Sequence, residues 1–437
     1  MSKLKKYKFS DLYEMSSGIS TKPEQAGKGY PFISFSTIFN NYFIPTELPD
    51  LMDSSDADRK KYSVKEGDIF LTRTSETVDE LGMSSVAIQD MPDATFSGFA
   101  KRLRPNQNDI TYHKFMAFYL RSKLFRKTMN NNALMTLRAS LNEQIFSYLE
   151  LLLPDYNTQK RIGDLLFLIN SRIELNNAIN NKLEDLAIAY FDYWFIQYDF
   201  PNKDGMPYKS SGGKMEYDKD LNIDIPLGWE VKRMNNYLSI DSGYSFDSDS
   251  YLEKGKFKII TIKNVQDSKF DTNTVSYIDD KPIGLPSTCE LHCGDILISL
   301  TGNVGRTCLV SEENTLLNQR VGKFSCDEKY HSYFYLLFKR REQRLRLIKI
   351  STGSSQKNLS PIDAVKAYNS FPNSVVLEDF NKVTNPLIDK IVSNEKISRK
   401  LEELRDWLLP MLINGQVTVA EAEAHINQAA EPQKDYS

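Results

Sequence analysis

Several features are missing from the sequence, and each absence excludes a class of protein. No apolar run approaches the roughly 20 residues that a membrane-spanning helix needs, and residues 1–6 lack the apolar stretch of a signal peptide. We therefore expect a cytoplasmic protein that has no membrane partner. Cysteine is scarce, and its four positions, 289, 293, 308 and 326, suit a reducing compartment.

Catalytic and metal-binding signatures are also missing. The spacing of Cys289 and Cys293 fits none of the common zinc patterns, so we expect no metal and small side chains in strands. The sequence has no Asn/Asp-Pro-Pro-aromatic methyltransferase motif, no Gly-x-x-x-x-Gly-Lys-Ser/Thr phosphate loop, and no nuclease set that recurs along the chain. We expect no catalytic residue. A formal net charge of −3 means that nucleic-acid binding must depend on local basic clusters.

An internal repeat organises the chain. Tyr112-His113 recurs as Tyr330-His331, an offset of 331 − 113 = 218, and Gly67-Asp68-Ile69 recurs as Gly294-Asp295-Ile296, an offset of 294 − 67 = 227. The offset of 218 also relates Leu141 to Leu359, Pro154 to Pro372, Ile173 to Ile391 and Asn176 to Asn394. A repeat of this length is a domain with its own core.

Each copy has the same order of expected elements: short apolar strands, a basic helix after the Tyr-His pair, a strand ending in proline, and a long helix. The fold class predicted is α+β, with two repeated globular α/β domains separated by two long helices. The predicted segments are a first domain over 1–156, a long helix over 157–198, a linker over 199–225, a second domain over 226–374, a second long helix over 375–417, and a frayed tail over 418–437.

The two long helices carry coiled-coil seams. Apolar residues alternate three and four apart from Ile162 to Trp194 and from Val383 to Met411. In each seam the one polar position is an asparagine, Asn176 or Asn394, at equivalent places in the repeat. We expect these residues to fix the register of a helix pair, the alternative being that each faces solvent or caps a bend. Pro386 indicates either a kink or a new helix start at Asn385.

Polar loops after the Gly-Asp-Ile strands are candidates for contacts with DNA bases. Arginine can bind guanine with two hydrogen bonds, asparagine can bind adenine, and hydroxyls can bind either. The candidates, in these loops and in further polar stretches, are Arg73, Thr74, Ser75, Lys101, Arg102, Arg138, Thr301, Asn303, Arg306, Asn318, Gln319, Arg320, Gln356 and Lys357.

The basic helices add candidate phosphate ligands, with a solvated helix face as the alternative: Arg121, Lys123, Arg126, Lys127, Lys339, Arg340, Arg341, Arg344, Arg346 and Lys349.

Similar scaffolds with different loops predict that the two domains bind two different short sequences. A first helix of roughly 55 Å would hold the two half-sites something over one DNA turn apart, because one turn is about 34–36 Å. The alternatives are a coiled-coil adaptor that does not recognise DNA, and a nuclease assembled from scattered acidic and basic residues.

The ordered motifs resemble the DNA specificity subunit of type I restriction-modification systems over nearly the whole chain. The resemblance lies in the two Gly-Asp-Ile strands, Asn318-Gln319-Arg320-Val321-Gly322, Gly353 to Ser360, Gln159-x-x-Ile162, Tyr193-Trp194-Phe195, and Leu404 to Gly415. The first copy departs from the family at 136–141, which include Arg138 and lack the family's usual glutamine.

The resemblance implies a non-catalytic subunit with two target recognition domains separated by an antiparallel coiled coil. Its implied partners are double-stranded DNA, two methyltransferase (modification) subunits, and restriction subunits that act as translocase and endonuclease. S-adenosylmethionine, ATP and Mg²⁺ are expected in those partner subunits rather than in this chain.

Overall fold

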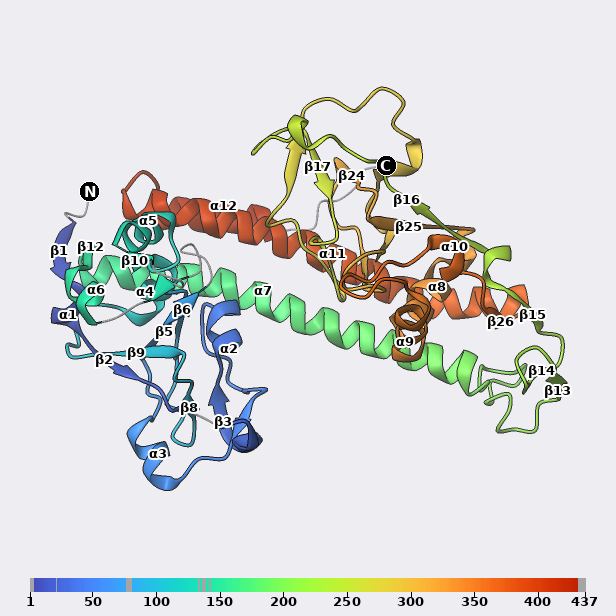
Figure 1. Cartoon of the computed structure of the whole chain (residues 1–437), viewed down its shortest axis with the longest axis horizontal. Helices are drawn as coiled ribbons and strands as arrows, with labels where there is room; N and C mark the ends of the chain where they lie inside the picture. Colours follow the sequence, from blue (N-terminus) through green and yellow to red (C-terminus); the bar gives the residue numbers. More distant parts are fainter. Residues whose placement is uncertain are drawn as a thin grey trace. The chain divides into compact units, whose positions relative to one another are not determined.

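The computed structural model describes residues 4–20, 22–75, 81–132, 134–135, 139–140 and 143–430 (Figure 1). The chain divides into two compact units, one of residues 1–173 with 399–437 and the other of residues 174–398. Each contains one copy of the repeat, so the units are described separately.

A four-stranded antiparallel sheet forms the centre of the first unit. Its order is β2 (Tyr13–Ser17), β9 (Ala100–Pro105), β5 (Ile69–Thr72) and β7 (Ser84–Val86). Every residue of β5 is fully buried, as the apolar run Ile-Phe-Leu predicts for a central strand.

Smaller elements surround this sheet. The described part of the first unit has three further sheets. These are β3 (Ala26–Ile33) between β4 (Leu51–Met52) and β8 (Thr95–Phe96), the ribbon of β1 (Lys5–Lys8) with β12 (Glu150–Leu153), and the sheet of β10 (Leu134–Met135), β11 (Ala139–Ser140) and β6 (Thr74–Ser75). Its short helices are α1 (Phe9–Leu12), η1 (Pro23–Gln25), α2 (Phe35–Asn40), α3 (Asp56–Lys61), α4 (His113–Tyr119), α5 (Lys123–Asn132) and α6 (Glu143–Tyr148).

The second unit repeats this topology. Its central sheet has the order β16 (Leu238–Ser242), β25 (Val321–Cys326), β22 (Ile296–Ser299) and β23 (Thr307–Leu309). Its second sheet has the order β20 (Ser276–Ile278), β17 (Phe257–Ile260), β24 (Thr315–Leu317) and β21 (Glu290–Leu291). The parallel pair β17–β24 corresponds to the parallel pair β3–β8 of the first unit.

The remaining elements of the second unit complete the correspondence. The ribbon of β15 (Glu230–Arg233) with β26 (Tyr368–Phe371) matches β1–β12. The other elements are the hairpins β13 (Met215–Asp218) with β14 (Ile223–Pro226) and β18 (Val265–Gln266) with β19 (Lys269–Phe270), and the helices η4 (Met234–Asn236), η5 (Ser248–Ser250), η6 (Ser287–Cys289), η7 (Glu328–Tyr330), α8 (His331–Lys339), α9 (Arg341–Ile350) and α10 (Pro361–Ala364). The predicted fold class is confirmed.

The recurring Gly-Asp-Ile motif is a structural device. The glycine before each aspartate has a positive φ, 85° in the first copy and 94° in the second, which a side chain would disfavour. The carboxylates of Asp68 and Asp295 each accept a hydrogen bond of 2.8 Å from the backbone N–H three residues earlier. Each also forms an ion pair with a basic residue of the neighbouring strand, Arg104 at 2.6 Å or Lys323 at 2.7 Å. The motif therefore fixes the entry into the central strand.

The two long helices are α7 (Tyr156–Phe191), continued by the π-helical turn η3 (Asp192–Ile196), and α11 (Ser374–Ile413) (Figure 1). Because α11 runs unbroken past Pro386, the alternative of a new helix start at Asn385 is wrong. The side chain of Asn385 instead accepts a hydrogen bond from the hydroxyl of Ser332 on α8.

Within the second unit, α7 and α11 are joined by a hydrogen bond of 3.2 Å from Asn180 Nδ2 to the carbonyl of Ile391 and by two further bonds that the repeat relates to each other. Asn176 Nδ2 donates to Ser398 Oγ at 3.1 Å, and Asn394 Nδ2 donates to Asn180 Oδ1 at 2.8 Å. The partner number on α11 falls as the number on α7 rises, so the segments are antiparallel. The two bonds are equivalent in the repeat, because 394 − 176 and 398 − 180 both equal 218. The two predicted register residues thus make matching contacts. Asn176 bonds to Ser398, and Asn394 bonds to Asn180, which is the repeat equivalent of Ser398.

The apolar seam of α7 departs from the prediction beyond this point. Ile179 and Leu186 are 38% and 45% exposed, whereas Asn180, Ala187 and Phe191 are buried. The buried face of α7 therefore runs one position out of step with the predicted seam, and it includes the polar Asn180. In the first unit, Arg405 Nη1 of α11 donates to Asn170 Oδ1 of α7 at 3.0 Å, a contact that no apolar pattern indicates.

The expectation of a frayed tail after residue 417 is wrong for its first part. Helix α12 (Val419–Ala430) follows α11. Thr418 and Glu421 form a capping box, in which the threonine hydroxyl accepts from the Glu421 N–H at 3.3 Å and the glutamate accepts from the Thr418 N–H at 2.8 Å. Ala422 is fully buried, and the ring of His425 contacts Trp407 edge to face. This capping signal was present in the sequence and was overlooked.

The paired asparagines predict a measurable stability effect. Asn394→Ala leaves the buried Asn180 amide oxygen without its donor, so we expect a loss of about 1–3 kcal/mol in the free energy of unfolding. Urea unfolding of the variant, beside the exposed-site control Lys390→Ala, measures it. Replacing Asn180 and Asn394 together by leucine should be close to neutral, since no unpaired polar group remains. Equal losses for the single and double variants would contradict this account.

Candidate nucleic-acid interface

In the second unit, three stretches predicted separately come together at one end of the central sheet. Leu300 N–H donates to the carbonyl of Arg320 at 3.1 Å, and Gly302 N–H donates to that of Lys357 at 2.9 Å. Leu359 N–H donates back to Leu300 at 2.8 Å. The loop after β22, the turn before β25 and the loop after α9 therefore form one continuous surface.

The first unit builds the corresponding surface in the same way. Thr74 pairs with Ser140 across β6 and β11, and Thr301 forms a bridge with Asn358 in the second unit. These pairs are repeat equivalents, since 301 − 74 = 227 and 358 − 140 = 218. Likewise Arg73 N–H donates to Phe99 O at 2.8 Å, where Leu300 donates to Arg320 in the second unit. The backbone scaffold of the candidate interface is thus duplicated.

The side chains on the two scaffolds differ. In the second unit Asn303, Gln319, Arg320, Gln356 and Lys357 are exposed, while Thr301 and Arg306 are half-buried. In the first unit Arg73 is exposed, and Phe99, at the place of Arg320, is 64% exposed. Thr74 and Ser75 lie in β6, whose backbone pairing places them beside β11. Arg138 lies outside the described residues.

The loop that carries Gln356 and Lys357 is a tight turn between two residues that pair with each other. Thr352 and Asn358 exchange backbone hydrogen bonds of 2.8 Å. Gly353 has a φ of 96°, and a Cβ there would lie 2.2 Å from the carbonyl oxygen of Gln356. Glycine is therefore required at this position, and the turn holds the two exposed side chains outward.

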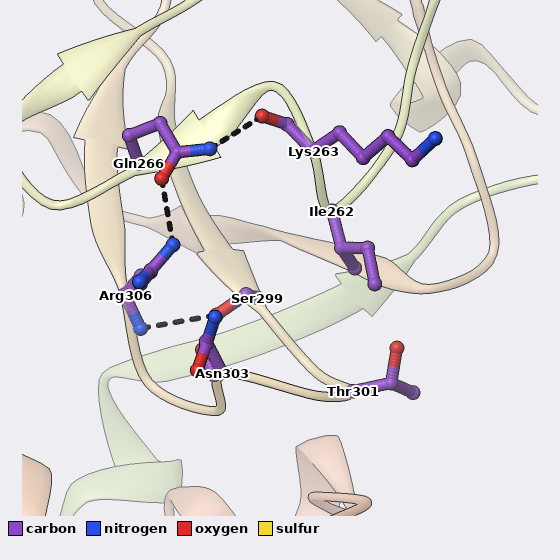
Figure 2. Close-up of a pocket in the computed structure, with 7 residues that line it drawn as sticks. All are labelled: Ile262, Lys263, Gln266, Ser299, Thr301, Asn303 and Arg306. Atoms are coloured by element: carbon purple, nitrogen blue, oxygen red, sulfur yellow. Dashed lines mark hydrogen bonds between the residues drawn. The ribbon is translucent and has the colours of Figure 1, made fainter. Parts of the chain in front are cut away.

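A hollow of about 200 Å³ lies between the loop after β22 and the hairpin β18–β19 (Figure 2). Arg306 Nη1 donates to Gln266 Oε1 at 2.6 Å, and Gln266 Nε2 donates to the carbonyl of Lys263 at 2.6 Å. The hydroxyl of Ser299 accepts from the Arg306 backbone N–H at 3.0 Å and donates to the carbonyl of Asn303 at 2.5 Å. Thr301, Asn303 and Arg306, all predicted, share this hollow with Lys263 and Gln266, which were not predicted.

Three of the residues predicted to bind DNA are buried and form hydrogen bonds within the chain. Lys101 and Arg102 are 8% and 9% exposed; the Lys101 ammonium donates to Ser17 Oγ at 2.7 Å and the Arg102 guanidinium donates to the Ser63 carbonyl at 2.6 Å. Asn318 is 6% exposed, and its side-chain oxygen accepts from the Arg320 N–H at 3.3 Å. Lys101 and Arg102 lie in the central strand β9, and Asn318 lies between β24 and β25. Neighbouring segments of the chain cover all three side chains.

The recurring basic residues of the short helices also have a structural explanation. Arg121 and Lys339 are repeat equivalents. Arg121 donates to the carbonyl of Ser84, the first residue of β7, at 2.6 Å, and Lys339 donates to that of Thr307, the first residue of the corresponding strand β23, at 3.5 Å. Burial lowers the pKa of Arg121, although a guanidinium stays protonated at neutral pH. The further members with partners inside the chain are Arg126, Arg340, Arg344 and Arg346. Arg121 and Lys339 therefore connect a helix to an adjacent strand, and their contact with a phosphate stays a prediction.

The two histidines of the repeat begin helices, as predicted. His113 and His331 are the first residues of α4 and α8, and the His331 Nε2 atom lies 3.0 Å from the carbonyl oxygen of Gly294. Burial lowers the pKa of both imidazoles, which keeps them neutral at pH 7. Their environment indicates a role in packing.

Two findings concern the described part of the chain as a whole. None of its helices has the length and apolar character that crossing a membrane demands. Within the same residues, no three or more His, Cys, Asp or Glu side chains are grouped so that they could hold a metal ion.

Comparison with known proteins agrees with this architecture. A family model described as the type I restriction modification DNA specificity domain matches residues 1–185 and 226–366. The MjaIX specificity subunit of Methanocaldococcus jannaschii is 23% identical over 427 residues, covering 95% of this chain and 93% of that protein. The HindI specificity subunit of Haemophilus influenzae is 24% identical over 471 residues, covering 95% and 100%.

A solved structure has the same fold. The S subunit of a type I restriction-modification system from M. genitalium superposes with a TM-score of 0.53 at 14% identity, covering 94% of this chain and 96% of that one. Its likeness, the two separate family matches and the duplicated scaffold all agree. The chain belongs to the type I restriction-modification DNA specificity family.

Proposed function

We propose that this chain is the DNA-recognition subunit of a type I restriction-modification complex and that it binds a bipartite, gapped and asymmetric site. The observation that carries the proposal is that the two copies share the backbone of their loops and differ in the side chains those loops expose. Exposed arginine, asparagine and glutamine side chains supply donors and acceptors suited to base edges. One scaffold with two sets of side chains would recognise two unlike half-sites.

The contrast is sharpest where Phe99 in the first unit corresponds to Arg320 in the second. An exposed phenylalanine can contact a thymine methyl group, while an arginine can bind guanine O6 and N7 or a phosphate. Different chemistry at equivalent positions is expected of an asymmetric target and is not expected of a palindromic one.

Catalysis is proposed to belong to partner subunits: two modification subunits that use S-adenosylmethionine, and restriction subunits that use ATP and Mg²⁺. Support comes from exposed apolar residues on α7, where Leu175, Ile179 and Leu186 are 59%, 38% and 45% exposed. They lie four and seven positions apart, on one face of the helix, and such a face is usually covered by another protein.

Methylation mapping tests the proposal. The chain, co-expressed with its modification subunit in a methylation-free host, should direct modification to one gapped asymmetric motif. Exchanging residues 1–156 for the first domain of a relative should change one half of that motif and leave the other unchanged. A stable complex that modifies no defined motif would contradict DNA recognition and favour the protein-adaptor alternative.

A point substitution tests the contribution of the first unit. Phe99→Ser should leave the unfolding midpoint unchanged, because the ring is 64% exposed. The complex that contains this variant should bind its cognate duplex about tenfold more weakly. Ile283, which is fully exposed and lies between β20 and η6 rather than in the loops described, provides the matched control Ile283→Ser. Equal affinities for the wild type, Phe99→Ser and Ile283→Ser would remove Phe99 from the interface.

A further inference from the structure

We propose that Gln266 is a positioning residue that holds the Arg306 guanidinium for recognition of a guanine in the half-site bound by the second domain. This inference rests on the proposed function and adds to it the base that is recognised, the arginine that recognises it and the glutamine that orients the arginine. Neither Gln266 nor its hairpin is part of the loops that the repeat duplicates.

The orientation of the Gln266 amide is determined by its two partners. The backbone carbonyl of Lys263 can only accept, so the amide nitrogen must face it, at 2.6 Å. The amide oxygen then faces Arg306 and accepts from Nη1 at 2.6 Å. A guanidinium can only donate, so both contacts are satisfied in a single arrangement of the amide (Figure 2).

Arg306 is also fixed at its backbone. Its N–H donates to the hydroxyl of Ser299, which is 1% exposed and is itself tied to the loop through Asn303. An arginine has five N–H donors, and among the described residues Gln266 is the one acceptor that its side chain meets. One N–H on Nη1 and both on Nη2 remain, so each terminal nitrogen can supply one of a pair of parallel hydrogen bonds, which is the arrangement that guanine O6 and N7 accept.

The hairpin that carries Gln266 is anchored from its other side. Its turn contains Asp267, which forms an ion pair with Arg344, and Ser268, whose hydroxyl contacts both Glu184 of α7 and Lys339 of α8. Lys339 and Glu184 are 5% and 12% exposed and lie 3.3 Å apart. Ser268 has a φ of 64°, a conformation that an L-residue keeps only when its surroundings enforce it. Gln266 therefore projects from a support that is held by buried charges.

This arrangement favours a base over a phosphate as the partner of Arg306. Arginines that bind phosphates need only reach the DNA backbone and can remain exposed, as Arg320 is here. Arg306 is half-buried, held at both ends, and faces a hollow of about 200 Å³ that it shares with the exposed side chain of Asn303. Holding a guanidinium this firmly is useful when its direction determines which base is accepted.

The experiment compares base preference position by position. Wild-type complex and the variants Gln266→Leu, Gln266→Glu and Arg306→Lys are each used to select bound duplexes from a pool randomised over the recognised motif. The wild type should require guanine at one position of the half-site that domain exchange assigns to the second domain. Arg306→Lys should reduce that preference by roughly 5- to 150-fold, the range that one two-bond contact provides.

Gln266→Leu should reduce preference at the same position by about tenfold and leave the other half-site unchanged. Gln266→Glu keeps an acceptor for Nη1 but loses the donor to the Lys263 carbonyl, so it should retain more of the guanine preference than Gln266→Leu does. Gln416→Leu, at an exposed glutamine after α11, is the matched control and should change nothing. The intact preference in the other half-site reports that each variant is folded and assembled.

The outcomes separate this inference from the proposed function. If the wild-type complex selects no motif, the proposed function fails. If it selects a motif and Arg306→Lys keeps full preference at every position, or lowers affinity equally for all sequences, then Arg306 contacts a phosphate or nothing at all and the inference is wrong. A position that Arg306→Lys changes and Gln266→Leu does not would leave Arg306 as a reader and remove Gln266 as its support.

Discussion

The pair of hydrogen bonds between α7 and α11 is the contact on which the arrangement of the second unit depends. Asn176 with Ser398 and Asn394 with Asn180 are related by the same offset of 218 that relates the two copies of the chain. An asparagine in an apolar seam costs stability unless it meets a partner, so only one register satisfies both bonds at once. Because the bonds are equivalent in the repeat, the two helix segments of the second unit pair through like surfaces in opposite directions.

Recurrence within the chain proved to be a guide to structure. Asp68 and Asp295 fix the entry to a central strand, and Arg121 and Lys339 connect a helix to an adjacent strand. Functional difference lies in what does not recur on the shared scaffold. Phe99 stands where the second copy has Arg320, and the hairpin that carries Gln266 borders the loop of the second copy.

The sequence predicted the fold class, the repeat, both long helices and the three converging loops of the second domain, because these depend on periodicity and on order along the chain. It could not predict burial of Lys101 and Arg102, because the sequence does not show whether a basic side chain in a strand faces solvent or bonds to a neighbouring segment of the chain. It also missed Gln266, which lies 40 residues from Arg306 along the chain and meets it only through the fold. Exposure of Ile179 and Leu186 was missed because two competing heptad registers fit the same helix.

We propose that two copies of one scaffold present different side chains to two half-sites of DNA. The most direct measurement replaces residues 1–156 with a second copy of residues 226–374 and maps the sites that the resulting complex modifies. We expect a palindromic motif whose halves both match the half-site of the second domain. An assembled complex that still modifies the original asymmetric motif, or no motif, would contradict this proposal.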